Sequence, residues 1–328
     1  MMRVGRDVFI ITLFTLVLGF VFSDWVGPYE QTILALCGIN IILAVSLNLV
    51  NGFTGQFSLG HAGFMAVGAY TSAALTTLYI SPEYVSGGVI SHLVFVVALL
   101  VGGVSAGIVG FLVGVPSLRL RGDYLAIVTL GFGEIIRVII LNIEAIGGAR
   151  GIGGIPGLTN LYWVVGVCIV STLALHRLLK SIPGQQFMAV RDDETATLAM
   201  GLSTTRIKVR SFVFSSFLAG VAGALFAHYY QYLNPSTFTF NYSFQIVAMV
   251  VLGGMGSLSG SILSAVGLTV LLEGLRELQT ITQLDLRMVL YSLILIVVML
   301  TRPRGLLGRK EIWEYLPVSL RKGVKKSS

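Results

Sequence analysis

Long apolar segments constrain this chain more than any other feature of its sequence. A helix of roughly 20 apolar residues crosses the hydrocarbon core of a bilayer, which is about 30 Å thick. Such segments recur along the whole chain, at 8–22, 32–50, 62–80, 93–115, 124–141, 161–175, 212–232, 244–257, 261–272 and 288–301. We therefore expect an all-α fold, a polytopic transmembrane helical bundle of about ten spans (8–10), because the eighth and ninth segments are short and glycine-rich.

The composition excludes a water-soluble globular protein. Hydrophobic residues make up 55 % of the 328 residues and charged residues only 11 %, whereas a soluble domain carries about a quarter charged residues. No hydrophilic stretch reaches the roughly 50 residues of a small soluble domain, so we expect one transmembrane domain over 1–328. Cys37 and Cys168 lie inside apolar segments, where thiols pack as small hydrophobes, and no Cys/His cluster predicts a metal site or a cofactor.

The distribution of basic residues predicts the orientation. The first apolar segment follows Arg3 and Arg6 and lacks a small-x-small cleavage site, so we expect it to be retained as a helix. With the N-terminus in the cytoplasm, 18 of the 22 Lys and Arg residues fall on the cytoplasmic side, as the positive-inside rule requires. The pattern predicts cytoplasmic termini, a cytoplasmic loop at 177–210 and a basic cytoplasmic tail at 303–328. Because topology explains the net charge of +7, we expect no nucleic-acid partner.

A polar, glycine-rich interruption separates the second and third apolar segments, with the sequence NGFTGQFSLGHAGF over 51–64. Interrupted helices leave backbone groups free to meet a solute in transporters. We predict a translocation path lined by polar residues of this interruption and by glycines of the eighth segment: Asn51, Gln56, Ser58, His61, Gly253 and Gly254. A structural re-entrant turn is one alternative, and a Ser58–His61 pair of an intramembrane hydrolase is another.

Two ionisable residues, Glu134 and Arg137, lie within the fifth apolar segment. Charged groups inside a span are expensive and mark functional sites, and pairing lowers their cost. The i, i+3 spacing predicts an intramembrane ion pair with a structural or assembly role. Coupling or gating of the solute is the alternative.

Glycine recurs at a spacing that favours close helix packing. A small residue at every fourth position lets the backbones of two helices approach in lipid. This spacing is found in three pairs, Gly103/Gly107, Gly110/Gly114 and Gly256/Gly260. We predict tight helix contacts there, with a hinge or a pore lining as the alternative.

The loop at 177–210 carries its own helix signals. Asp192 is predicted to cap a short helix whose first turn holds Asp193 and Glu194. Gly201 is predicted to end that helix in the left-handed conformation. A helix of about two turns is not stable alone in water. It therefore needs a surface, either the protein's own bundle or a cytoplasmic partner.

Four segments together resemble a known family. They are GFTGQFSLGHAGFMAVGAY from Gly52, GDYLAIVTLGFGEIIR from Gly122, FMAVRDDETATLAMG from Phe187, and VVLGGMGSLSGSILSAV from Val250, which RPRGLLG follows from Arg302. In this order they are similar to the permease subunits of ABC importers for branched-chain amino acids, of the LivM type. The resemblance covers nearly the whole chain.

The resemblance implies a bacterial inner-membrane permease that forms the path for leucine, isoleucine and valine. It implies four kinds of partner: a second homologous permease, two cytoplasmic ATPase subunits, an extracytoplasmic solute-binding protein and the amino acid itself. The loop at 177–210 would be the coupling loop, resting in a groove of the ATPase. That role falls on Arg191, Asp192, Asp193, Glu194 and Gly201.

Other functions remain open from the residues alone. A similar branch of permeases serves urea and short amides. An ion-gradient transporter would need unpaired acids or histidines at the membrane midplane. A phosphate-binding loop requires GxxxxGK followed by Ser or Thr, and no lysine here follows a glycine. We therefore expect a transport subunit rather than an enzyme, with ATP hydrolysis on separate subunits.

Overall fold

The computed structural model describes residues 27–80, 88–118, 120, 122–282, 292–293, 296–297, 300–301, 305–308 and 311. The first predicted span and most of the last lie outside the described residues. The same is true of most of the basic tail predicted at 303–328.

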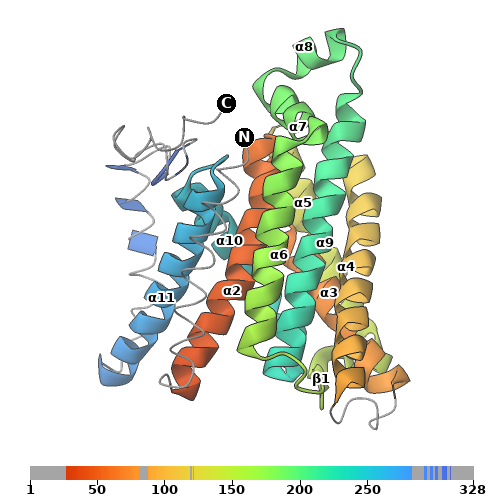
Figure 1. Cartoon of the computed structure of the whole chain (residues 1–328), viewed down its shortest axis with the longest axis vertical. Coiled ribbons are helices and arrows are strands. Elements are labelled where there is room, and N and C mark those ends of the chain that lie inside the picture. Colours follow the sequence, from red (N-terminus) through yellow and green to blue (C-terminus); the bar gives the residue numbers. More distant parts are fainter. Residues whose placement is uncertain are drawn as a thin grey trace, which may run out of the picture.

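Long helices run side by side through the described part of the chain, and two short helices lie beyond one end of them (Figure 1). The helices are α2 (Pro28–Asn48), α3 (His61–Ala74), α4 (Val89–Ser117), α5 (Asp123–Asn142), α6 (Leu161–Lys180), α7 (Ile182–Asp192), α8 (Glu194–Ala199), α9 (Thr204–Tyr230), α10 (Phe240–Gly253) and α11 (Leu258–Thr282). Two π-helical turns, η1 (Leu49–Phe53) and η2 (Leu75–Tyr79), extend α2 and α3.

Six helices of the described residues are long and apolar enough to cross a membrane: α2 with η1, α4, α5, α6, α9 and α11. The predicted all-α membrane fold is thereby confirmed. Shorter helices, α3 and α10, occupy two further predicted segments. Because the first segment and most of the last lie outside the described residues, the total of about ten spans stays a prediction.

The α2 helix occupies the centre of the bundle. All of its residues from Cys37 onward are buried, and so are those of η1. A helix that is apolar around its whole circumference must be surrounded by protein or lipid, and here α6, α9, α10 and α11 surround it. The central position of α2 makes its end, at η1, a point that several helices share.

Glycines bring α3, α4 and α9 into direct backbone contact. A Cβ on Gly68 of α3 would overlap the backbone of Gly220 on α9, and one on Gly223 would overlap the Met65 carbonyl. On α4, Gly103 and Gly110 face side chains of α9. Large apolar residues cover the outer face of α4, including Leu93, Leu100, Val104, Ile108 and Leu112. Small residues inward and large residues outward are typical of helices that associate in lipid, and the close packing predicted for the α4 glycines is found within the chain.

A short antiparallel pair ties two connections together at the end of the bundle opposite α8 (Figure 1). Strand β1 (Ile152–Gly153), between α5 and α6, pairs with β2 (Tyr232–Leu233), which follows α9. Three-residue 3₁₀ turns flank the strands at η4 (Glu144–Ile146), η5 (Gly148–Arg150) and η6 (Pro235–Thr237). This backbone pairing joins the two connections at one end of the bundle, while the other end carries α7 and α8.

Candidate functional site

The predicted interruption between the second and third segments contains a non-helical stretch, 54–60, that joins η1 to α3. The π-helical turn closes through bonds from the Thr54 amide to the Leu49 carbonyl (3.1 Å) and from the Gln56 amide to the Val50 carbonyl (2.9 Å). The stretch ends where α3 begins, at His61, which lies beside Ser46 of α2. π-Helical turns are rare and concentrate at functional sites.

Buried side chains satisfy the backbone of this interruption. The Asn51 carboxamide oxygen accepts from the Ser58 amide at 3.1 Å. Thr129 of α5 accepts from the Leu59 amide at 3.0 Å, and Ser243 of α10 accepts from the Ala62 amide at 3.1 Å. Buried backbone donors need partners, and here three different helices supply them.

The predicted path residues of this stretch occupy two kinds of position. Asn51, Ser58 and His61 are buried, whereas Gln56 is half-buried. The His61 Nε2 atom lies 2.9 Å from the Ser46 hydroxyl rather than from Ser58, and the backbone N–H and carbonyl of Ser58 bond to the Asn51 side chain. A nucleophile needs its base within hydrogen-bonding reach, so the Ser58–His61 pair of the hydrolase alternative is not assembled.

A second interruption, between α10 and α11, packs against the first. Gly253 approaches Gly260 closely enough that a Cβ on either would overlap the other's carbonyl, and Gly254 has a φ of +111°. The side chain of Asn48 bridges the two interruptions. Its amide nitrogen donates to the Ser257 carbonyl at 2.9 Å, and its oxygen accepts from the Gly256 amide at 2.9 Å.

Sequence reasoning missed Asn48. It is fully buried at the end of α2, and an unpaired amide side chain there would cost several kcal/mol. An asparagine inside an apolar segment is itself a signal that a polar partner is nearby. That signal does not say that the partner is a turn more than 200 residues away in the sequence.

The charged pair of α5 also contacts the first residue of a neighbouring helix, α10. Arg137 Nε lies 2.7 Å from Glu134 Oε2. The other carboxylate oxygen of Glu134 accepts from the Phe240 amide, the first of α10, at 3.2 Å. Carboxylates stabilise the N-terminal ends of helices, so this pair joins α5 to α10.

The segment predicted to cap a short helix is built one residue later than expected. Asp192 is the last residue of α7, and the Asp193 amide still bonds to the Ala189 carbonyl at 3.0 Å. The prediction that Asp192 is the N-cap is therefore wrong, because α7 runs through that position. Asp193 has extended backbone angles, and its carboxylate accepts from the amides of Thr195 and Ala196 at 2.8 and 2.9 Å.

The end of α8 follows the prediction. Gly201 has a φ of +80°, the left-handed conformation that glycine adopts most readily. The helix itself spans six residues, Glu194–Ala199. It therefore has about two turns and depends on its contacts for stability.

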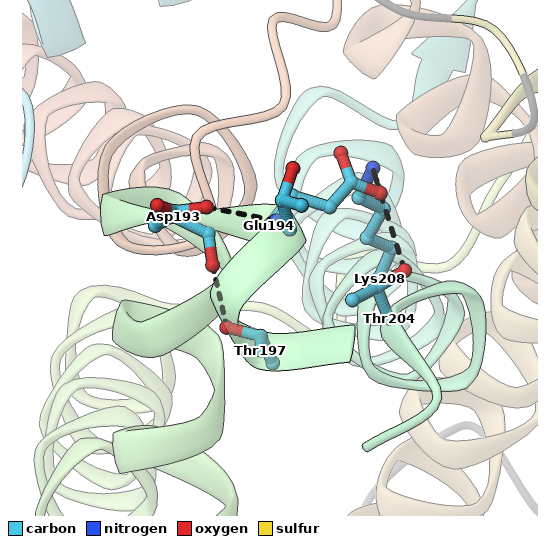
Figure 2. A network of polar contacts seen from close by, with 6 residues as sticks. Asp193, Glu194, Thr197, Thr204 and Lys208 are labelled. Atoms are coloured by element: carbon cyan, nitrogen blue, oxygen red, sulfur yellow. Dashed lines mark hydrogen bonds and ion pairs between the residues drawn. The ribbon is translucent and has the colours of Figure 1, made fainter. Parts of the chain in front are cut away.

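Polar contacts anchor the inner side of α8 to α9 (Figure 2). Glu194 accepts from Lys208 Nζ at 2.7 Å and from the Thr204 hydroxyl at 3.1 Å. The Lys208 side chain is only 3 % exposed, so its charge requires this partner. The Thr197 hydroxyl donates to the Asp193 carbonyl and tightens the first turn (Figure 2).

The outer side of the same segment is open. Leu198 is 47 % exposed and Met200 is 81 % exposed. The Asp192 side chain is 60 % exposed and bonds to its neighbour Arg191 at 3.0 Å. Two apolar side chains, one in α8 and one directly after it at the tip of the molecule (Figure 1), are therefore available to a partner.

A cleft of about 300 Å³ lies between this segment and the bundle. Its walls come from 55–57, from Gly122 and Leu125 near the start of α5, from 190–194 and from Lys208. The coupling segment predicted from the sequence thus borders directly on the interruption after α2. Among the described residues no group of His, Cys, Asp and Glu side chains fits a metal ion, and Cys37 and Cys168 are buried free thiols.

Comparison with known sequences places the chain among transport proteins. The family model described as "Branched-chain amino acid transport system / permease component" matches residues 31–299. No solved structure matches the chain.

Three curated relatives carry matching descriptions. The high-affinity branched-chain amino acid transport system permease protein LivM of Escherichia coli (strain K12) is 37 % identical over 93 % of this chain and 75 % of its own length. The protein of the same name in Salmonella typhimurium is 39 % identical over 82 % of this chain and 68 % of its own length. The permease protein LivH of E. coli is 24 % identical over 83 % of this chain and 92 % of its own length.

Proposed function

The chain belongs to the branched-chain amino acid transport permease family and resembles its LivM members, and from that premise we propose that it forms half of the path of an ATP-driven importer. It is the permease component, a transport subunit with no catalytic activity of its own. The LivH relatives support pairing with a second, homologous permease. Two cytoplasmic ATPases and an external solute-binding protein complete the proposed complex.

The open outer face of α8 is the observation that carries the coupling role. Leu198 and Met200 are exposed although they are apolar, and the opposite side of the helix is held by the Glu194–Lys208 ion pair. A partner with an apolar groove would bury these side chains, each worth about 1.5–3 kcal/mol when fully covered. We assign that groove to the ATPase subunit.

The proposed orientation places α7 and α8 in the cytoplasm of a bacterial cell, with the chain in the plasma (inner) membrane. Basic residues at this end support it, including Arg177, Lys180, Lys208 and Arg210, because basic loops stay in the cytoplasm. The proposal keeps about ten spans, with both termini cytoplasmic, in one domain over 1–328. The coupling loop is 177–210 and the tail 303–328 is cytoplasmic.

The solute path is proposed to follow the two interruptions, where they meet at Asn48. Most of its residues are buried in this conformation, so the solute would reach them only when the interruptions separate. Interrupted helices are the usual site of solute contact in transporters. The path residues are Asn51, Gln56, Ser58, His61, Gly253 and Gly254, and the Glu134–Arg137 pair holds α5 against α10 beside them.

The proposal is tested on the complex purified from its native membrane. We expect a second permease and two ATPases to stay bound, and Leu198→Ser with Met200→Ser to release most of the ATPase. Tyr79→Ser is the matched control, since Tyr79 is 80 % exposed and ends η2 near the opposite end of the bundle. Full retention of the ATPases by the double variant would contradict the docking face.

The solute and the energy source are tested in proteoliposomes that contain the complex. We expect ATP-dependent uptake of leucine, with isoleucine and valine competing and urea and acetamide failing to compete. The descriptions of the LivM relatives support this choice of solute. Uptake that needs an ion gradient instead of ATP would overturn the proposed mechanism.

A further inference from the structure

One residue of the coupling segment turns inward. The Arg191 side chain is 16 % exposed, and its Nη1 atom donates to the Gly52 carbonyl at 3.3 Å. Gly52 lies in η1, where the chain leaves its helical path and carbonyls lose their helical partners. A cation is favoured at such a C-terminal helix end. Arg191 therefore joins the end of α7 to the end of the broken helix.

Steric contact reinforces this hydrogen bond. A Cβ on Gly55 would lie 2.9 Å from Arg191 Cγ and 3.3 Å from Arg191 Cα, and Gly55 has a φ of +72°. The backbone after η1 is thus pressed against the last turn of α7 at a position that only glycine fits. Well-packed contacts shift as units rather than deform, so α7 cannot move far without moving this stretch.

The same turn of η1 contacts the second interruption on its other side. A Cβ on Gly52 would overlap both the Asn48 side chain and the Gly256 amide. The fully buried Asn48 bonds to that amide and also to Ser261 of α11, at 2.8 Å. A continuous set of contacts therefore runs from α7, through Gly52 and Asn48, to the turn between α10 and α11.

The second anchor of the α7–α8 segment, Glu194, connects it to α9. Glu194 binds Lys208 and Thr204 at the start of α9, and α9 is packed through glycines against α3 and α4. This contact anchors the segment to the start of α9. Of the two anchors, Arg191 is the one that bonds directly to the first interruption.

We propose that Arg191 is a positioning residue that transmits movement of the α7–α8 segment to the two interruptions. The inference rests on the proposed function, since it needs an ATPase to move the segment. When the segment shifts, Arg191 moves the end of η1 through Gly52 and Gly55, and Asn48 carries the shift to the α10–α11 turn. Arg191 touches neither the ATPase nor the solute in this role.

The test measures leucine taken up per ATP hydrolysed, using only purified, fully assembled complex in proteoliposomes. Arg191→Gln removes the charge and the bond to Gly52, and Arg191→Lys restores a cation. Arg210→Gln is the matched control, because Arg210 is an exposed basic residue of the same end. We expect ATP hydrolysis to persist in Arg191→Gln while uptake per ATP falls at least fivefold. Arg191→Lys is expected to recover most of the uptake per ATP, and Arg210→Gln is expected to give the same uptake per ATP as the unmodified chain.

Each other result decides the question. An unchanged ratio in Arg191→Gln would overturn the proposal. If neither Arg191 variant yields an assembled complex, Arg191 is an anchor for folding and the proposal is also overturned. Failure of the proposed function has a different signature, because the unmodified complex would then lack ATP-driven uptake altogether.

Discussion

Two neighbouring regions of this molecule are held together by different kinds of contact, one by close backbone packing and the other by a few polar bonds. The contact of α3, α4 and α9 is made by glycines such as Gly68 and Gly220, whose backbones leave no room for another atom. The α7–α8 segment rests on a few polar contacts, chiefly Arg191 with Gly52 and Glu194 with Lys208. The first contact depends on shape over a long interface, and the second depends on single atoms.

This difference separates a scaffold from a part that can move. Close packing is lost steeply when two surfaces separate, because dispersion attraction falls off within an ångström. A hydrogen bond between a charged group and a carbonyl can persist while its two elements move together. We therefore expect α3, α4 and α9 to stay fixed while the α7–α8 segment carries the end of η1 with it.

The largest effect is expected from Gly68→Val, which breaks the shape-dependent region. The new side chain would meet the Gly220 backbone, and backbone in a helix cannot move aside as a side chain can. Overpacking of a core costs about 1–3 kcal/mol and occasionally more, so we expect a loss of about 3 kcal/mol. The yield of monodisperse protein in detergent and its thermal midpoint measure it.

Gly166→Ala is the control for that prediction. A Cβ on Gly166 of α6 meets nothing within 4 Å, and alanine favours the helix by about 1 kcal/mol over glycine. We expect equal or greater stability. Equal stability of Gly68→Val and the unmodified chain would remove the contrast between the two regions.

A smaller loss is expected from Asn51→Leu, which leaves the Ser58 amide without its acceptor. A buried donor without a partner costs about 1–3 kcal/mol, so we expect about 2 kcal/mol by thermal unfolding. Asn142→Leu provides the same change at the exposed end of α5, where the Asn142 side-chain amide donates to the Val138 carbonyl of its own helix. Equal losses in the two variants would show that the interruption does not depend on Asn51.

The helices α3, α4 and α9 and their contacts were predictable from the sequence in part. Apolar segments and the four-residue spacing of the α4 glycines are local patterns, and both correspond to observed helices and contacts. The contact of Gly68 with Gly220 was not predictable, because no spacing links residues so far apart. The same holds for Asn48, whose partner turn is distant in the sequence.

The end of the short helix α8 was predictable from the sequence, whereas its start was not. Gly201 ends α8 as its sequence indicates, since a left-handed glycine is a local signal. Three consecutive acids, Asp192, Asp193 and Glu194, can each cap a helix. The choice among them depends on where α7 stops, and that is set by the contacts of α7 rather than by the acids.

Lys208→Met sharpens the comparison on the polar side. The change removes the ion pair and the buried charge of Lys208 while keeping an extended apolar side chain. Hydrogen bonds to charged groups contribute about 1.5–3 kcal/mol, and Glu194 is partly exposed, so we expect a loss of about 1.5 kcal/mol confined to α8. Hydrogen exchange of the α8 amides should quicken about tenfold while that of α3 is unchanged. Arg210→Met is the control, and equal quickening in both would contradict the anchor.

The smallest effect separates two adjacent carboxylates, Asp193 and Asp192. Asp193→Ala removes the acceptor of the Thr195 and Ala196 amides, and loss of an N-cap costs about 1 kcal/mol. Exchange of these two amides should quicken about fivefold. Asp192→Ala removes only an exposed pair with Arg191, worth about 0–1 kcal/mol, and should leave both amides unchanged. The opposite result would make Asp192 the N-cap of α8, so that α7 would end before Asp192. Arg191 would then no longer lie where it contacts Gly52.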